Sequence, residues 1–356
     1  MERRTFLRAV GLSTIAGLAG CTGGPTESGS TTTTTNGSGT SVAMVYATGG
    51  LGDGSFNDQA QTGLEQAEGE FDINSEHSQP GRTSEFKQHQ SQYAQQGDWD
   101  LISCIGSLQH DALAEVAPEY PDQKFMVVDT KVDADNVESY QFREEQGSFQ
   151  VGYLAGLVTT KGLSTANAES TDQKKVGFVG GSKIPLIEKF EAGYRAGVKH
   201  VDSSITVSSK YAGSFNDIAK GKEAALSQYN SGADVVYHAA GNTGTGVFKA
   251  AKEAGRFALG VDKDQSKTAP KYADYILASM VKHVDIAVYD GISNVVNDEF
   301  EGGSATTLGL EKDGLETVYG DTLGSEIPDS FKSELESTKS KLTAGDISVP
   351  TDPSNV

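Results

Sequence analysis

An aromatic ring and a carboxamide, Phe56 and Asn57, directly follow a loop that contains four glycines. The loop, GGLGDGS over residues 49–55, is neither the G-x-G-x-x-G of dinucleotide sites nor a Walker A loop, and no Lys-Ser or Lys-Thr pair follows it. Phosphate binding is therefore disfavoured. A flat apolar ring beside an amide that both donates and accepts suits a planar heterocycle better than an anion. The alternative is a tight turn that needs several positive φ angles and holds no ligand.

These residues lie where a predicted strand meets a predicted helix. Residues 42–46, VAMVY, are rich in β-branched and aromatic types and predict a buried strand. Ser55 stands where a helix N-cap is expected, before a helix with one apolar face. That face consists of Ala60, Leu64, Ala67 and Phe71. In open α/β sheets this arrangement places a ligand at the carboxyl end of the strand, near free helix N–H groups.

Residues 1–21 predict export and lipidation. Arg3 and Arg4 precede a short apolar segment, and the sequence Leu-Ala-Gly-Cys ends at Cys21, which is typical of a twin-arginine signal closed by a lipobox. The apolar segment is shorter than the roughly 20 residues that a membrane span needs. We expect cleavage and lipidation at Cys21; the alternative is an uncleaved anchor helix. Both place the remainder on the extracytoplasmic face of the cell membrane.

Residues 22–41 consist mainly of Ser, Thr and Gly and predict a disordered tether. Beyond Cys21 the chain has only Cys104, so no intramolecular disulfide is expected once Cys21 is lipidated, and stability must come from the core. With 29 Lys+Arg against 49 Asp+Glu, the net charge is −20. Such a surface repels nucleic acid and suits a protein adapted to high salt.

Strands and helices alternate after the tether at the spacing of βαβ units, which predicts mainly parallel sheets in an α/β fold. The roughly 310 residues exceed one hydrophobic core and predict two lobes with the ligand between them. We expect residues 42–143 plus 266–303 in the N-terminal lobe, and 144–265 plus 304–356 in the C-terminal lobe. Further strands are predicted at 100–105, 124–129, 137–142, 175–180, 205–211, 233–239, 257–262 and 275–280, and extended chain at 307–318. Further helices are predicted at 84–95, 111–119, 144–160, 185–200, 216–231, 245–254, 283–300 and 330–342.

Six passages stand out: residues 49–58, 121–157, 174–200, 233–253, 260–265 and 279–292. They closely resemble the basic membrane protein (BMP) family, the substrate-binding lipoproteins of ABC transporters. The resemblance covers residues 42–318, and its motifs occur in the family's order. It implies a type I periplasmic-binding-protein fold, with two doubly wound α/β lobes joined by a multi-crossover hinge. It also implies a monomer that binds purine nucleosides, as the nucleoside receptor of spirochaetes does, and delivers them to an ABC permease and ATPase.

The resemblance assigns the base of the ligand to aromatic and amide side chains. The family's stacking rings fall on Phe56 and on Phe215, which stands in a second GSFND at a predicted helix start. Phe190 is a third possible ring, with core packing as its alternative. The amide contact falls on Asn57, which can serve a base edge in both directions. Stacking on a base contributes about 1–3 kcal/mol.

The resemblance assigns the sugar to charged side chains. Asp129 ends the fourth strand of the first lobe, Gly241 backs the ligand, and Asp262 with Lys282 is the pair that holds ribose hydroxyls. A carboxylate that accepts from two hydroxyls and a lysine that donates back make charge-assisted bonds. The alternatives are that Asp129 caps a turn, that Lys282 is a solvated surface charge, and that Asp262 only neutralises Lys263.

One departure from the family concerns the first loop. Where many members have an aspartate, this chain has Ala47 followed by Thr48. Thr48 is a candidate ligand-binding residue, and the loss of the carboxylate leaves the purine preference open. A binding protein for another heterocycle such as riboflavin, or a ligand sensor, is the alternative function.

Catalysis is disfavoured. The chain has no G-x-S-x-G, H-E-x-x-H or C-x-x-C motif, and its six histidines lack metal-ligand spacing. Asp129 and Asp262 could form the acid and base of a nucleoside hydrolase, but two carboxylates at a ribose are also expected for binding alone. A transcriptional regulator would begin with a helix-turn-helix rather than an export signal. We therefore expect no catalytic residue, no cofactor, no metal and no nucleic acid.

Overall fold

The computed structural model describes residues 39–356. The predicted signal, the predicted lipidation site Cys21 and residues 22–38 of the predicted tether lie outside the described residues. Among residues 39–356, no helix combines the length and the apolar character that a membrane crossing requires.

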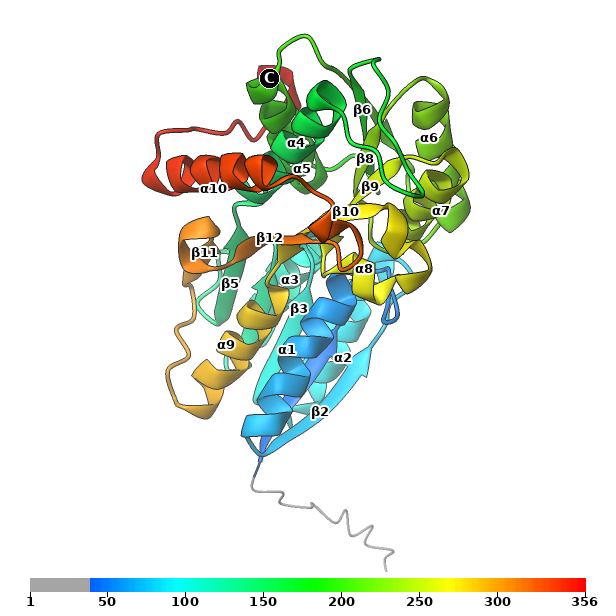
Figure 1. Cartoon of the computed structure of the whole chain (residues 1–356). Coiled ribbons are helices and arrows are strands. Elements are labelled where there is room, and N and C mark those ends of the chain that lie inside the picture. The colour runs from blue at the N-terminus through cyan, green and yellow to red at the C-terminus, as the bar shows by residue number, and fades with distance from the viewer. Residues whose placement is uncertain (1–38) are drawn as a thin grey trace, which may run out of the picture. The chain divides into compact units, whose positions relative to one another are not determined.

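The first sheet has six parallel strands in the order β11-β5-β4-β3-β1-β2 (Figure 1). Alternate residues of β1 enter different cores: Val42 and Met44 pack with α1, and Ala43 and Val45 pack with α2 and α3. Helices α1 and α9 therefore cover one face and α2 and α3 the other, as expected for a doubly wound sheet. The strands are β1 (Thr40–Val45), β2 (Ile73–Ser78), β3 (Leu101–Ile105), β4 (Phe125–Val128), β5 (Val137–Phe142) and β11 (Ala305–Leu308), and the helices are α1 (Phe56–Glu70), α2 (Phe86–Gln96), α3 (His110–Val116) and α9 (Val284–Val296).

The second sheet also has six strands, in the order β12-β10-β9-β8-β6-β7, and only β12 runs antiparallel to its neighbour. Helices α4 and α5 pack on one face with α10 against α4, and α6 and α7 cover the other face. The strands are β6 (Lys175–Gly180), β7 (Thr206–Tyr211), β8 (Val235–Ala239), β9 (Phe257–Asp262), β10 (Ile276–Lys282) and β12 (Leu315–Tyr319). The helices are α4 (Glu144–Lys161), α5 (Pro185–Val201), α6 (Ile218–Asn230), α7 (Gly244–Ala254), α8 (Gln265–Thr268) and α10 (Asp329–Ala344). Short 3-10 helices are Thr83–Glu85, Ser107–Gln109, Ala117–Glu119, Gly241–Thr243, Pro270–Tyr275, Leu310–Lys312, Leu323–Ser325 and Pro353–Asn355.

Within the described residues the chain passes between the sheets at Arg143, at His283 and over residues 309–314. The backbone N–H of Arg143 donates to Leu308 O at 2.9 Å, and that of His283 donates to Gly314 O at 3.0 Å. The crossing segments are thus bonded to one another, as a hinge of several strands requires.

The expected lobe boundaries are wrong at two strands. Strand β10 lies in the segment 266–303 that we expected in the first lobe, yet it belongs to the second sheet. Strand β11 lies in the segment 304–356 that we expected in the second lobe, yet it belongs to the first sheet. The crossings fall inside these segments because β10 pairs with β9 whereas the following helix, α9, packs on α1.

Strand β2 was not predicted. Its sequence INSEHS has no apolar alternation, and its side chains are mostly exposed. It forms because it pairs with β1 along the sheet edge, where the ladder supplies backbone bonds without burying side chains. Strand β5, which was predicted, is almost wholly buried because it lies between β4 and β11.

Candidate functional site

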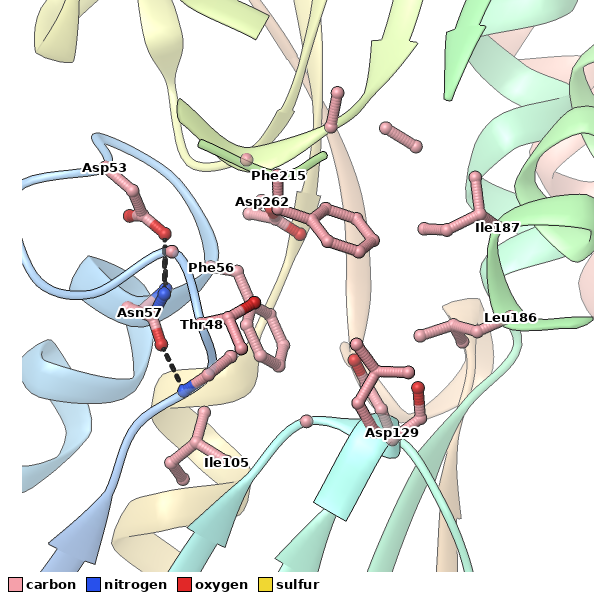
Figure 2. A pocket seen from close by; sticks show the side chains of 18 of the residues that line it. Thr48, Asp53, Phe56, Asn57, Ile105, Asp129, Leu186, Ile187, Phe215 and Asp262 are labelled. Carbon is pink, nitrogen blue, oxygen red and sulfur yellow. Dashed lines mark hydrogen bonds between the residues drawn. The ribbon is translucent and has the colours of Figure 1, made fainter. Parts of the chain in front are cut away.

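A cavity with an empty volume of about 670 Å³ lies at the carboxyl ends of strands from both sheets (Figure 2). This space includes the solvent at the mouth of the cavity. Every ligand-binding residue predicted from the sequence lines it. They are Thr48, Phe56, Asn57, Asp129, Phe190, Phe215, Gly241, Asp262 and Lys282.

The glycine loop is held by Asp53, which the sequence did not single out. Its carboxylate accepts from the backbone N–H of Ser55 at 2.9 Å and of Asn57 at 3.0 Å. Asp53 therefore satisfies the N-terminus of α1, and Ser55, although at the N-cap position, makes no side-chain capping bond. Burial raises the pKa of Asp53 despite these backbone bonds.

The carboxamide of Asn57 already has a protein partner at each end. Its Oδ1 accepts from the backbone N–H of Ala47 at 2.9 Å, and its Nδ2 donates to Asp53 at 3.0 Å, as the dashed lines in Figure 2 show. Only 2% of Asn57 is exposed. It therefore fixes the loop and, with it, the position of Thr48.

Two phenyl rings enter the cavity from different sheets (Figure 2). Phe56 begins α1, and its ring centroid lies 4.6 Å from Lys282 Nζ, within cation–π range. Phe215 lies against Gly181, where a Cβ would come within 2.4 Å of its ring. Both residues are partly exposed, and both line the cavity.

The second GSFND does not repeat the local structure of the first. Helix α6 begins at Ile218, and Asp217 caps it by accepting from Lys220 N. Phe215 therefore precedes the helix instead of opening it. The difference arises because Ala212 stands where the first copy has its capping carboxylate, Asp53.

Asp129 directly follows β4, and Asp262 is the last residue of β9. Both have left-handed backbones, with φ angles of 71° and 65°. This region is strained for most residues but tolerated by aspartate. The left-handed turn at each residue directs its carboxylate into the cavity at the carboxyl ends of the strands.

Lys282 forms a buried ion pair with Asp129. Its Nζ lies 2.9 and 2.7 Å from the two oxygens of Asp129, and both side chains are 2% exposed. Burial opposes the ammonium charge, but the carboxylates of Asp129, Glu144 and Asp262 outweigh it and raise the pKa of Lys282. The surface-charge alternative for Lys282 is therefore wrong.

Asp262 accepts a hydrogen bond from Ser55 Oγ at 2.5 Å. Burial raises its pKa to about 6, although Lys282 and the Ser55 hydroxyl both lower it. The alternative that it neutralises Lys263 is wrong, because Lys263 Nζ donates to Asp58 O and Thr62 Oγ1.

Phe190 and Gly241 both line the cavity and also pack against neighbouring parts of the protein. Phe190 is 2% exposed and belongs to the core, yet it lines the cavity 5.5 Å from Lys282 Nζ. Core packing of Phe190 is therefore observed, and its contact with a ligand stays a prediction. Gly241 has φ 54°, and a Cβ there would approach Phe215 O at 3.2 Å, so a side chain at this turn would be strained.

Apolar side chains missed by the sequence reasoning complete the wall. Leu108 follows β3, and Leu186 and Ile187 open α5; Figure 2 shows the latter two pointing into the cavity. The one signal for Leu108 was its position after a strand, because all parallel strands of a sheet end at the same edge. Among residues 39–356, no group of three or more His, Cys, Asp or Glu is placed to hold a metal ion.

Glu144 should make stability depend on pH. It is 1% exposed, with Lys189 Nζ 2.8 Å and Lys282 Nζ 3.9 Å away, and burial raises its pKa from 4.5 to about 7. A pKa raised by folding favours the folded state below pH 4.5, and this contribution is lost as pH rises through 7. We expect the unfolding free energy of the wild type, relative to Glu144→Gln, to fall by at most about 3 kcal/mol over this range.

Urea unfolding at a series of pH values measures this difference. The matched control is Glu115→Gln, since the Glu115 side chain is 64% exposed and its replacement should leave the pH dependence unchanged. A difference for Glu144→Gln that stays constant with pH would show that Glu144 keeps its charge throughout.

The family model described as "ABC transporter substrate-binding protein PnrA-like" (Bmp) matches residues 40–351. The ABC transporter nucleoside-binding protein BmpA of Lactococcus lactis is 33% identical, over 98% of this chain and 99% of its own length. An uncharacterized lipoprotein of Pyrococcus abyssi is 36% identical, over 87% of this chain and 75% of its own length.

Solved structures agree with the sequence comparisons. An ABC transporter solute-binding protein from Aeropyrum pernix superposes with a TM-score of 0.78 at 29% identity, covering 88% of this chain and 93% of its own. The prediction of a type I periplasmic-binding-protein fold is thereby confirmed.

Proposed function

Because the chain belongs to the Bmp family of PnrA-like ABC transporter substrate-binding proteins, we propose that its ligand is a purine nucleoside. Family and relatives are substrate-binding proteins and not enzymes, so the cavity binds its ligand without converting it. The observation that carries the proposal is the presence in one cavity of two partly exposed phenyl rings and four buried charged side chains. A relative named as nucleoside-binding supports it.

Each part of a nucleoside has a suitable partner in the cavity. The base stacks between Phe56, at the start of α1 beside the first sheet, and Phe215, between β7 and α6 of the second sheet. The vicinal hydroxyls donate to Asp262 and Asp129, and Lys282 donates to a sugar oxygen. Hydrogen bonds to charged groups in a buried site are strong, and a missing hydroxyl leaves a partner unpaired. Ribosides should therefore bind more tightly than 2′-deoxyribosides or free bases.

Nucleotides should bind poorly. Of the cavity-lining residues in the described part of the chain, Lys282 alone is basic, and Asp129 already neutralises it. A phosphate would also meet the carboxylates of Asp53 and Asp262. Ala47 and Thr48 supply no charge to the base edge, so the protein should tolerate inosine, adenosine and guanosine.

We propose that the two sheets with their helices act as lobes that close on the ligand about the crossing segments at Arg143, His283 and residues 309–314. Lipidation of Cys21 and the tether of residues 22–41 would hold this monomer at the extracytoplasmic membrane surface, where the permease and ATPase receive the nucleoside. The lipoprotein name of the Pyrococcus relative supports the anchor.

Titration calorimetry in high salt with nucleosides, 2′-deoxynucleosides, free bases, nucleotides and riboflavin tests the ligand. We expect heat from purine nucleosides and little from nucleotides or bases. Tight binding of riboflavin alone would assign the cavity to a flavin, and no binding by any nucleoside would refute the proposal. Nucleoside-dependent labelling of a co-purified permease would separate transport from sensing.

A further inference from the structure

The glycine loop and the start of α1 are bonded to the chain that follows β9. Gly54 O accepts from Thr268 Oγ1 at 3.0 Å and from Gln265 Nε2 at 3.2 Å. Lys263 Nζ donates to Thr62 Oγ1 at 2.9 Å. We call these contacts between residues 54–62 and 262–268 the clasp. Because β1 and β9 belong to different sheets, the clasp can form only while the two sheets are close together.

One bond of the clasp differs from the others because it ends on a charged side chain of the cavity. Ser55 Oγ donates to Asp262 Oδ2 at 2.5 Å, and Ser55 is fully buried. This hydroxyl is not required for capping, since Asp53 already accepts from the N–H groups at the start of α1. Ser55 therefore stands at a helix N-cap position but directs its hydroxyl to the other sheet.

We propose that Ser55 is a positioning residue for ligand binding: its hydroxyl holds the Asp262 carboxylate in its charged form and orientation, and couples this to closure. The inference rests on the proposed function. With Oδ2 bonded to Ser55, Oδ1 remains for the hydroxyls of a ribose. When the sheets separate, Asp262 loses this donor together with the rest of the clasp, so the open form binds the sugar less well.

The groups around Asp262 make the hydrogen bond from Ser55 important for keeping its carboxylate charged. Burial, Asp53 from the glycine loop and Asp129 after β4 all act against its negative charge. Tyr237 on β8 stays neutral beside it, because burial raises the pKa of this phenol well above its usual value. Lys282 on β10 favours the charge but is shared with Asp129 and with Glu144 on α4. Burial already raises the pKa of Asp262 to about 6, and the Ser55 bond is one of the contributions that lower it. Without that bond, the carboxyl group should protonate at higher pH.

Calorimetry with inosine from pH 5 to pH 8 tests the proposal. For Ser55→Ala we expect about tenfold weaker binding at pH 7.5. The midpoint pH, at which half of the high-pH affinity is lost on acidification, should be higher than in the wild type. Ser55→Thr, which keeps the hydroxyl, should restore the wild-type midpoint pH. Thr268→Val is the matched control: it removes a clasp bond without touching Asp262, so affinity should fall slightly and the midpoint should stay.

An equal pH midpoint in Ser55→Ala and Thr268→Val would overturn the proposal. A ligand-free measurement separates this failure from that of the proposed function. Carbon-13 NMR of aspartate carboxyl groups, assigned with Asp262→Asn and recorded with and without inosine, should show Asp262 titrating at higher pH in Ser55→Ala than in the wild type. This shift is expected in the closed form whether or not a nucleoside is bound. Identical titration curves under both conditions would refute the role of Ser55.

Discussion

Lys282→Met is expected to lower the unfolding free energy by about 3–5 kcal/mol and to weaken nucleoside binding by about a hundredfold or more. Lys282 is 1% exposed, and its ammonium lies within 2.9 Å of both oxygens of Asp129 and 3.9 Å from Glu144. Its removal leaves buried carboxylates without a cation, and the ligand loses the one basic group of the cavity in the described chain. Urea unfolding and calorimetry measure the two effects.

The double variant Asp129→Asn/Lys282→Met distinguishes the two roles. Removing both charges of the pair should recover much of the stability, because no uncompensated Asp129 carboxylate remains. Binding should not recover, since the ligand still lacks both partners. If the double variant bound nucleoside as the wild type does, the pair would be structural only. If Lys282→Met alone were as stable as the wild type, the ion pair would contribute nothing to folding.

Phe215→Ala is expected to weaken nucleoside binding by about ten- to a hundredfold, the value of one stacked ring at about 1–3 kcal/mol. The ring is partly exposed and lies on Gly181 at the cavity, so its loss should change the unfolding free energy little. Phe56→Ala should weaken binding similarly, and additionally removes the ring 4.6 Å from Lys282 Nζ. Calorimetry with inosine measures both.

Phe71→Ala is the control for these truncations. Phe71 is also partly buried, but its ring stacks on Tyr289 at 5.9 Å and does not line the cavity. It should leave the affinity unchanged. Equal affinities of Phe215→Ala and the wild type would remove Phe215 from the site, and a loss of binding with Phe71→Ala would show that ring truncation acts through the fold.

Local patterns were sufficient for most elements of the fold. Strands β5, β6 and β9 begin and end at the predicted residues, because each is a short run of strand-forming types between turn signals. Edge strand β2 was missed because its residues carry no burial pattern. The start of α6 was missed because two identical pentapeptides differ in the residue before them, Asp53 in one and Ala212 in the other.

The sequence by itself determined the fold class, the alternating elements and nine of the residues that line the cavity, because composition, periodicity and motifs are local properties of a chain. Only the tertiary structure decided which side chains are partners. Lys282 is bonded to Asp129, 153 residues away, and Ser55 to Asp262, 207 residues away. These pairs depend on the order of strands within each sheet and on how the two sheets meet. No local pattern encodes a distance between two strand ends in different sheets, so the charges of the site could be predicted from the sequence but their pairing could not.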